Sequence, residues 1–262
     1  MLHAVQKHKT RLHNRYLGER DGTEHRVHEE DEITSTVLGP IDFLAPSEAH
    51  KFWQRLLSVV GKGDFLPTTI PDNVRIELWK RNEKGNIEPD AVVTMKWQNL
   101  PSYILLIELK WRAGLSHVSS NSENQLSCQW KHYLNDLERK TALHLFIAPE
   151  VSIGARAYDE DIWQDRMVLI PWLTIRSVFN ELSCETSGLG RWAKVADAFL
   201  DRVNIRRFCG FRDLLSVPAP DIPANTLKQA FWMAKPFFEG IVCIQIPQLQ
   251  DTDVIFFEST KG

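Results

Sequence analysis

Residues 103–111 read YILLIELKW, and this stretch decides the fold because its apolar run ends in two charged side chains. Residues 104–107 are apolar on both faces, which predicts a central strand covered from both sides. Glu108 falls where such a strand leaves the core, so its carboxylate is partly desolvated. A desolvated acid costs free energy unless it is paired or binds a metal. The stretch therefore predicts a central strand that carries a buried acid.

Two more strands are predicted just before this one. Residues 74–80 alternate between apolar and polar side chains, which is typical of a strand with one solvated face. Residues 89–96 form a second strand-like run, and the turn-rich residues WQNLPS (97–102) separate it from residues 103–110. The three runs predict a three-stranded meander.

Helical periodicity surrounds the predicted meander. Ile33, Val37, Ile41 and Leu44 recur at helical spacing, with Gly39-Pro40 interrupting the helix. A second helix is predicted over about 47–60, with Ser47 as its N-cap. Phe52, Leu56 and Val59 would share one face of it, and Leu126, Trp130, Tyr133, Leu134 and Leu137 mark an amphipathic helix after the meander.

The second half of the chain adds short strands and further helices. Residues 142–148 and 167–170 are apolar runs bounded by prolines, as expected of buried strands, and helices are predicted near 174–182 and 192–203. The order of elements predicts an α/β fold, with a central mixed sheet flanked by helices. Because a Gly-rich phosphate loop follows none of these strands, a nucleotide-binding fold is not supported.

Three segments are predicted along the chain. Residues 1–28 are polar and rich in His, Lys and Arg, which indicates an N-terminal arm that is a solvated tail or grips DNA. Residues 29–216 form the main domain. The proline-rich residues 217–223 read as a linker, and 217–262 as a small α+β C-terminal extension.

The hairpin of the second and third strands brings two acids together. If its loop is centred on Asn99, residues whose numbers sum to 198 face one another, and Asp90 lies opposite Glu108. Directly opposed like charges are destabilising, so a cation is expected between them. Lys110 projects from the same face as Glu108, with Glu88 opposite it in this register. Carboxylates converging beside an ammonium make a hard oxygen site suited to Mg²⁺ or Mn²⁺. The alternative is an exposed Glu108–Lys110 ion pair.

Glu30 and two glutamines are further candidates. Glu30 falls on the apolar stripe of the first predicted helix, although an acid in a first turn also interacts favourably with the helix dipole. Gln125 and Gln129 are four residues apart on a helix face distinct from the leucine stripe, where their amides would orient water or phosphate. Gln125 also fits a capping box that starts at Ser122, and Gln129 fits a solvated position.

Pro89-Asp90 followed by Glu108-Leu109-Lys110 resembles the PD-(D/E)xK nuclease superfamily, which has the restriction-endonuclease-like fold. Residues 30–148 reproduce the helix, three strands, helix and strand of that family's core. The resemblance places the glutamate of its preceding helix on Glu30 and the glutamine of its following helix on Gln125 or Gln129.

The resemblance implies a Mg²⁺-dependent phosphodiesterase in which Mn²⁺ substitutes for Mg²⁺. Asp90, Glu108 and the Leu109 carbonyl would hold the metal, with Glu30 as an additional ligand. Lys110 would position or deprotonate the attacking water and stabilise the developing negative charge. By analogy the substrate is DNA, and the setting is defence, restriction or repair. The alternative is a catalytically silent, nuclease-like subunit that binds nucleic acid or a partner protein.

Composition limits the other classes. With 43% hydrophobic and 25% charged residues, wholesale disorder is excluded. A net charge of -3 argues against a protein that coats nucleic acid, and points to a partner subunit that helps hold the substrate; a homo-oligomer is also compatible. The four cysteines and nine histidines lack zinc-site spacing. Without a signal-like or membrane-spanning run, a cytoplasmic protein that does not enter a membrane is expected. Trp97 and Trp111 either stack on bases or pack in the core.

Overall fold

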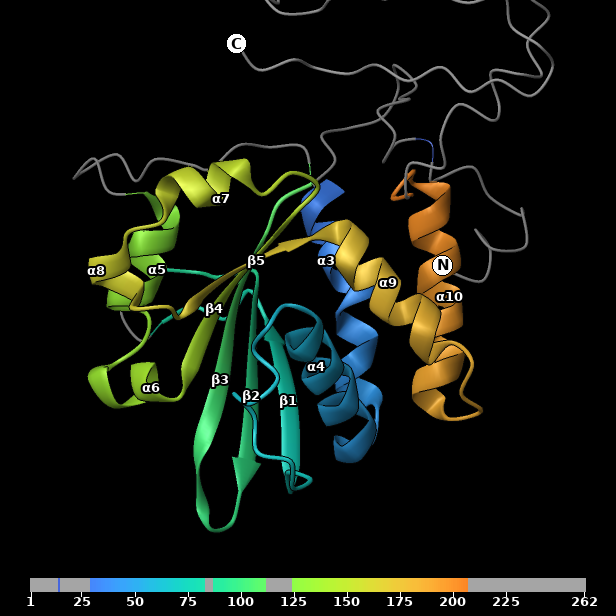
Figure 1. Ribbon diagram of the computed structural model, residues 1–262, viewed down its shortest axis with the longest axis horizontal. Coiled ribbons are helices and arrows are strands. Elements are labelled where there is room, and N and C mark those ends of the chain that lie inside the picture. The colour runs from blue at the N-terminus through green and yellow to red at the C-terminus, as the bar shows by residue number, and fades with distance from the viewer. Residues whose placement is uncertain (1–13, 15–28, 83–86, 112–123, 207–262) are drawn as a thin grey trace, which may run out of the picture. The chain divides into compact units, whose positions relative to one another are not determined.

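The computed structural model describes residues 14, 29–82, 87–111 and 124–206. All of them belong to one compact unit, Met1–Arg207. The predicted linker and C-terminal extension lie outside the described residues, and so does the predicted arm apart from residue 14. The described part is an α/β fold, with a five-stranded mixed sheet flanked by helices (Figure 1).

The sheet keeps its strands in sequence order. The first three strands form the predicted antiparallel meander, and the fourth and fifth then add parallel to the third. Each parallel step needs a crossover connection, which helices provide here. The strands are β1 (Asn73–Leu78), β2 (Ala91–Trp97), β3 (Leu100–Leu109), β4 (Ala142–Ala148) and β5 (Met167–Pro171).

The hairpin register matches the prediction. From Ala91↔Ile107 to Met95↔Tyr103 every paired number sums to 198, and a bulge next to the turn shifts only the last pair, Trp97↔Leu100. The alternation of side chains follows from this register. Leu105 and Ile107 of β3 face one layer of helices, while Leu106 faces the other. β3 is therefore the central strand that its apolar run predicts.

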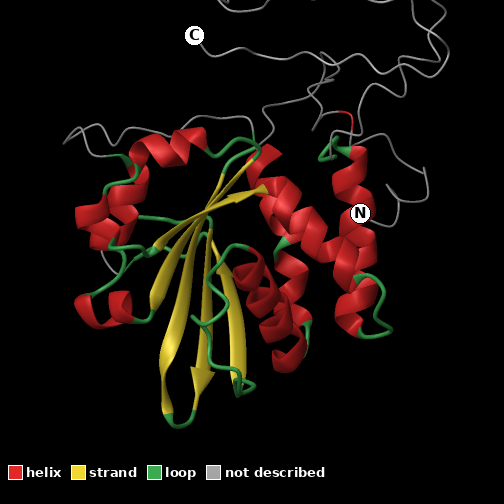
Figure 2. Ribbon diagram, in the orientation of Figure 1, coloured by secondary structure: helices red, strands yellow, loops and turns green. Residues whose placement is uncertain are grey.

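Helices cover both faces of the sheet, as Figure 2 shows. The larger apolar cluster joins one face to the first and last helices, and the smaller one joins the other face to the helices of the two crossovers. The first layer contains α3 (Glu29–Val37), the 3₁₀ helix η1 (Gly39–Phe43), α4 (Pro46–Val59), α9 (Trp172–Leu182) and α10 (Gly188–Arg202). The crossovers contain α5 (Gln125–His132), α6 (Asp136–Lys140), α7 (Ser152–Ala157) and α8 (Glu160–Trp163).

Two details of the predicted helices before the meander are resolved. The Gly39-Pro40 interruption is confirmed, because α3 gives way there to the 3₁₀ turn. The N-cap prediction is wrong: α4 begins at Pro46, its N-cap is Ala45, and no side chain caps it. A proline at the first helical position has no N–H that needs an acceptor, so a capping hydroxyl is not required. Val59 is 45% exposed and does not belong to the buried face.

The helix predicted after the meander is shorter than its leucine stripe suggests. α5 ends at His132, and a separate short helix starts at Asp136, so Leu137 is 74% exposed. Asn135 causes the break because its side chain accepts hydrogen bonds from the Leu137 and Glu138 N–H groups, and the Glu138 carboxylate completes a capping box. Ser122, from which a capping box is predicted, lies outside the described residues; α5 begins at Gln125, and Asn124 is its N-cap.

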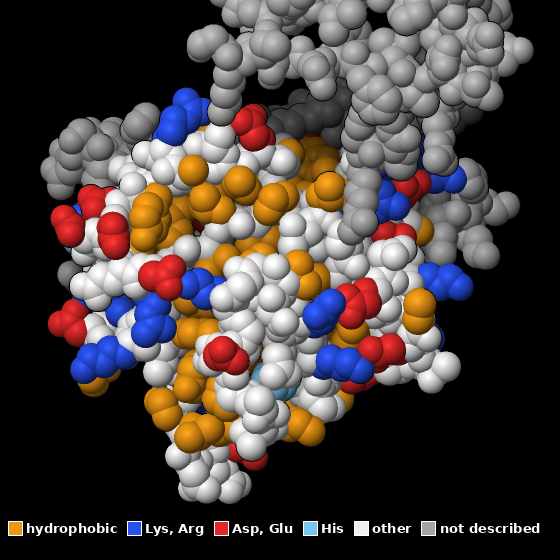
Figure 3. Space-filling view, in the orientation of Figure 1, with side chains coloured by type: hydrophobic (Ala, Val, Ile, Leu, Met, Phe, Trp, Pro, Cys, Tyr) orange, Lys and Arg blue, Asp and Glu red, His pale blue; other side chains and the backbone are white. Residues whose placement is uncertain are grey.

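The surface carries mixed charge. Lys and Arg side chains are interspersed with Asp and Glu over the face shown in Figure 3. Trp111 is buried and packs edge-on against Trp172, so it belongs to the core and is not free to stack on a base. None of the helices in the described part combines the length and the apolar character needed to cross a membrane.

Candidate active site

Asp90 and Glu108 lie at the open end of the β2–β3 hairpin. Asp90 immediately precedes β2, and its backbone carbonyl accepts a hydrogen bond from Trp79 N (3.1 Å), which continues the β1–β2 ladder. Its carboxylate Oδ2 accepts a hydrogen bond from Leu109 N at 2.6 Å. The confirmed register therefore carries Asp90 across to the end of β3, as the sequence predicts.

Glu108 is completely buried, and both of its carboxylate oxygens are engaged. Oε1 forms an ion pair with Lys110 Nζ at 2.5 Å, and Oε2 accepts a hydrogen bond from Gln129 Nε2 at 2.7 Å. The Glu108–Lys110 pair is therefore buried, and the alternative of an exposed ion pair at the strand end is wrong. The interpretation of Gln129 as a solvated position is also wrong, because its side chain is buried against the acid.

Glu30 joins the same cluster from α3. Its Oε1 accepts a hydrogen bond from Lys110 Nζ at 2.9 Å, and its Oε2 accepts one from Trp111 N at 3.0 Å. The two oxygens therefore bind consecutive residues just beyond β3. Glu30 also lies in the first turn of its helix, so the two interpretations of this residue hold together.

Glu88 does not belong to the cluster. Instead of facing Lys110, its carboxylate is paired with Arg81 at 2.5 Å and is partly exposed. The hairpin register would place these two residues opposite one another only if the ladder continued beyond Asp90. The β1–β2–β3 pairing ends at Ala91, so the register argument no longer applies at Glu88.

The cluster has more negative than positive charge. Of its three carboxylates, Glu108 and Glu30 contact the single ammonium of Lys110, and Asp90 interacts with it electrostatically without a direct ion pair. Burial, together with the nearby Glu108, raises the pKa of Asp90 to about 8, and burial likewise raises the pKa of Glu108. Burial alone would lower the pKa of Lys110, but the adjacent carboxylates, Glu108 first, raise it well above its usual value. Lys110 therefore stays protonated.

A divalent cation suits this imbalance. With all four groups ionised, the cluster has a formal charge of -2, and oxygen ligands are what Mg²⁺ and Mn²⁺ prefer. Asp90, Glu108 and the Leu109 carbonyl supply the oxygen atoms that the sequence predicts as ligands, and Glu30 contacts the Lys110 ammonium. The ammonium, however, lies against both Glu108 and Glu30. Across the described ranges, groups of three or more His, Cys, Asp or Glu side chains arranged around a single ion position are absent.

A chain of buried polar side chains continues from Gln129. Gln129 Oε1 lies 3.2 Å from His144 Nε2, and Trp163 Nε1 donates a hydrogen bond to His144 Nδ1 at 3.2 Å. Sequence reasoning missed both residues. A signal for His144 is present, because it is the one polar side chain in the otherwise apolar strand ALHLFIA (142–148). Trp163 has no such signal.

Gln125 is not brought to the carboxylates. It is the first residue of α5, and its side-chain oxygen is buried without a hydrogen-bond partner. Gln129 lies one turn further along the same helix and makes the contact with Glu108. Of the two glutamines, the structure therefore favours Gln129 as the site residue.

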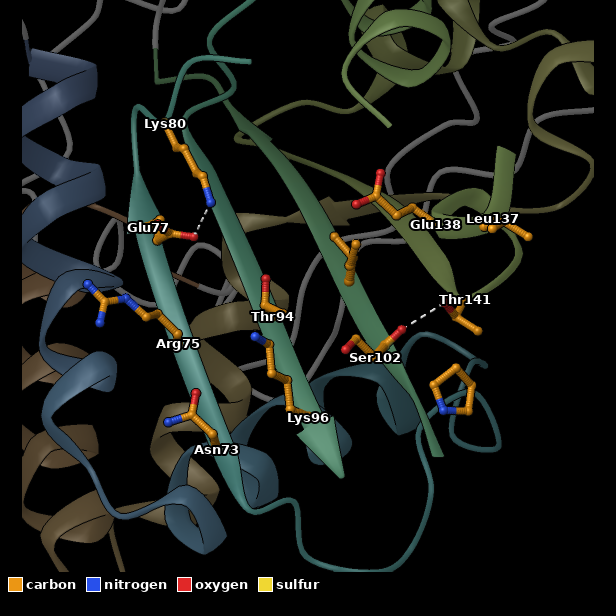
Figure 4. A pocket seen from close by; sticks show the side chains of 12 residues that line it. Asn73, Arg75, Glu77, Lys80, Thr94, Lys96, Ser102, Leu137, Glu138 and Thr141 are labelled. Carbon is orange, nitrogen blue, oxygen red and sulfur yellow. Dashed lines mark hydrogen bonds and ion pairs between the residues drawn. The ribbon is translucent and has the colours of Figure 1, made fainter. Parts of the chain in front are cut away.

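A hollow of about 500 Å³ opens on the sheet, shown in Figure 4. Thr94 and Lys96 of β2 line this hollow. Both are an even number of residues from Asp90, so their side chains lie on the same face of the sheet as the carboxylate of Asp90. Lys80 points toward Glu77 and pairs with it at 2.6 Å. The remaining lining residues are Asn73, Arg75, Pro101, Ser102, Ile104, Leu137, Glu138 and Thr141.

Two cations of this hollow are free of ion pairs. Arg75 on β1 and Lys96 on β2 are both exposed, and neither has an ion-pair partner among residues 29–82, 87–111 and 124–206. Figure 4 shows the Lys96 side chain reaching toward Thr94 along β2, while the Arg75 side chain extends from β1 away from β2. The hollow therefore offers hydrogen-bond donors and unpaired positive charge to a ligand.

Comparison of this chain with family models, with curated proteins and with solved structures finds no match.

Proposed function

We propose that this chain is a Mg²⁺-dependent nuclease that hydrolyses phosphodiester bonds of DNA, with a restriction-endonuclease-like core. The observation that carries the proposal is a cluster of three carboxylates at the end of the central strand: Glu108 and Glu30 pair with the ammonium of Lys110, and Asp90 accepts a hydrogen bond from Leu109 N beside them. The order of elements from α3 to β4 supports it. An endonuclease of defence, restriction or repair is the setting that we infer.

Each side chain of the cluster has a different role in the proposed reaction. A bound Mg²⁺ would supply the positive charge that polarises the scissile phosphate and acidifies a water molecule. Asp90 and Glu108 would hold that ion, and Gln129 keeps one oxygen of Glu108 occupied. Because the pKa of Lys110 is raised, its ammonium stabilises developing negative charge and orients water, rather than removing a proton.

A catalytically silent binding subunit is the second candidate. One observation favours it: the Lys110 ammonium already compensates Glu108 and Glu30, which stabilises the cluster without any metal. In that case the hollow that contains Arg75 and Lys96 would be the functional surface, and the carboxylates would serve only the fold. The two candidates differ in whether the cluster binds a divalent ion.

Cleavage assays test the proposal directly. Plasmid and single-stranded DNA are incubated with the protein in Mg²⁺, in Mn²⁺ and in EDTA. Cleavage is expected with either metal and not in EDTA, and Glu108→Gln is expected to lower the rate by more than about 100-fold, since loss of a residue that merely supports a metal ligand already costs 10- to 100-fold. The matched control is Glu181→Gln, which neutralises an exposed glutamate paired with Arg55. Equal rates for the two variants would refute the assignment.

Metal binding separates the two candidates without any cleavage. At Mn²⁺ concentrations 100 times the dissociation constant, mass action stabilises the folded protein by about 2.7 kcal/mol. A dose-dependent rise in Tm is therefore expected for the parent chain and for Glu181→Gln, and its loss is expected in Glu108→Gln. If the Tm of the parent chain does not change with Mn²⁺ concentration, the cluster does not bind the ion and the catalytically silent subunit is the correct candidate.

DNA binding is expected to use the hollow that contains Arg75 and Lys96. Replacing both Arg75 and Lys96 by alanine should weaken binding in EDTA, and should reduce the slope of log affinity against log salt by up to about 2, since each lost phosphate contact removes about 0.9. The control is Lys51→Ala with Arg55→Ala, which removes the same charge from α4 on the opposite layer. If the control weakens binding as much, the hollow is not the contact surface.

A further inference from the structure

A buried line of hydrogen bonds leads from the candidate active site to helix α8. Its members are Trp163, His144, Gln129 and Glu108, and each is at most 2% exposed. The three contacts measure 3.2, 3.2 and 2.7 Å. Because these groups are buried, an unpaired donor or acceptor among them is unfavourable.

The direction of every hydrogen bond follows from one residue. An indole N–H only donates, so His144 Nδ1 must carry a lone pair and no proton. The neutral imidazole then has its proton on Nε2 and donates it to Gln129 Oε1. The amide nitrogen of Gln129 is thereby directed at Glu108 Oε2, which receives a donor.

The reverse arrangement leaves groups unsatisfied. A proton on His144 Nδ1 would face the indole N–H of Trp163, and a bare Nε2 would favour a rotated Gln129 amide. The amide oxygen would then face the carboxylate of Glu108, with two acceptors in contact. Each unsatisfied buried group is unfavourable, so the sequence of donors admits a single direction.

We propose that His144 is a positioning residue for the candidate active site, held in its Nε2–H form by Trp163, and that it fixes the carboxylate of Glu108 through Gln129. With Oε2 occupied by the amide, Oε1 is the oxygen that faces Lys110. The orientation of Glu108 is thus set by residues from β4, α5 and α8. Its consequence for metal binding rests on the proposed nuclease function, whereas the tautomer does not.

The surroundings of His144 keep it neutral. Trp130 stacks on the imidazole with the ring planes 9° apart, and Trp163 covers it at a centroid distance of 6.2 Å. Burial lowers the pKa of His144 to about 3. The ring therefore orients its neighbours and does not shuttle protons.

The tautomer is tested first, in the metal-free protein. Two-bond ¹H–¹⁵N correlation spectra of the imidazoles, with the His144 signal assigned by its loss in His144→Gln, are expected to show a bare Nδ1 and a protonated Nε2 at neutral pH. A protonated Nδ1, or an imidazolium, would overturn the proposal. In Trp163→Phe the single form is expected to give way to a mixture of tautomers.

A pair of matched tryptophan variants tests the positioning role. Trp163→Phe removes the N–H that selects the tautomer, while Trp130→Phe removes an N–H that donates to the Ile162 carbonyl and leaves the aromatic stacking. Mn²⁺ affinity is expected to fall 10- to 100-fold in Trp163→Phe and less than about 3-fold in Trp130→Phe. Equal losses in the two variants would show a purely structural role.

Substitutions at His144 complete the test. Glutamine can present an amide N–H near the position of Nε2 and should restore part of the Mn²⁺ affinity, whereas His144→Leu leaves the Gln129 oxygen unpaired and should not. Identical affinities in the two variants would contradict the proposal. A parent chain that binds no Mn²⁺ refutes the proposed nuclease and the effect on the metal, while the tautomer measurement still decides the direction of the line.

Discussion

Asp90→Asn is expected to make the metal-free protein more stable at pH 8 and to abolish metal-dependent cleavage. Asparagine keeps an oxygen that accepts the Leu109 N–H, but it removes a carboxylate that Glu108 and burial both disfavour. The same carboxylate is a ligand in the proposed nuclease. A site that serves catalysis at the expense of stability gives this pair of opposite effects.

The pH dependence has a definite sign. The pKa of Asp90 is about 8 in the folded protein against a reference of 3.8, so the folded state binds one more proton throughout that window. Stability from this group is present below pH 3.8 and is lost as the pH rises to about 8, by roughly 1.4 kcal/mol per unit. Burial lowers the pKa of His144 and gives the opposite slope at acid pH, but this slope is common to parent and variant and cancels in their difference.

Denaturant unfolding in EDTA at pH 6, 7 and 8 measures this difference. The parent chain should lose stability relative to Asp90→Asn as the pH rises. Saturating Mn²⁺ should reverse the order by stabilising the parent alone. If the difference between the two proteins is constant from pH 6 to pH 8, Asp90 is ionised in the folded protein throughout this range, and burial does not raise its pKa as described.

Lys110→Met is expected to destabilise the protein by about 3–5 kcal/mol, the usual cost of leaving a buried charge without its partner. The lysine is 7% exposed and compensates both Glu108 and Glu30, and methionine fills its volume without its charge. Loss of activity in this variant therefore needs a folding control. Mn²⁺ is expected to restore part of the stability, because a divalent ion can replace the lost ammonium.

The matched control is Lys51→Met. Its ammonium pairs with Glu185 at 2.7 Å, but its side chain is 55% exposed, and exposed ion pairs contribute at most about 1 kcal/mol. Urea unfolding of the two variants, with and without Mn²⁺, gives the comparison. A cost for Lys110→Met no greater than that for Lys51→Met would mean that Glu108 and Glu30 are neutralised by other means.

The parts of the site that could be predicted follow from local patterns in the sequence. The register of the hairpin follows from counting across one turn, so the placement of Asp90 against Glu108 could be predicted. Glu30 could be found because helical periodicity puts it on a buried stripe, and its contact with Lys110 agrees with that. Gln129 could be named as one of two candidates from its spacing on a helix face, and the resemblance to a nuclease family points to the same two residues.

The residues that escaped prediction depend on packing between distant segments. Trp163 meets His144 only because α8 packs beside β4, and no local pattern encodes that contact. The missed break after His132 has a different cause: the leucine stripe continues, but the capping box at Asn135 starts a new helix. Ser47 was misassigned because Pro46 starts the helix one residue earlier.

The spacing of the cluster along the chain also sets the order in which it forms. The hairpin that opposes Asp90 and Glu108 closes over a tight turn, whereas Glu30 must find Lys110 across 80 residues. Closing the longer loop costs more entropy, so the two acids approach before their full compensation is in place. Refolding should therefore be slowed by acid repulsion in EDTA and should accelerate at lower pH, where protonation removes the repulsion.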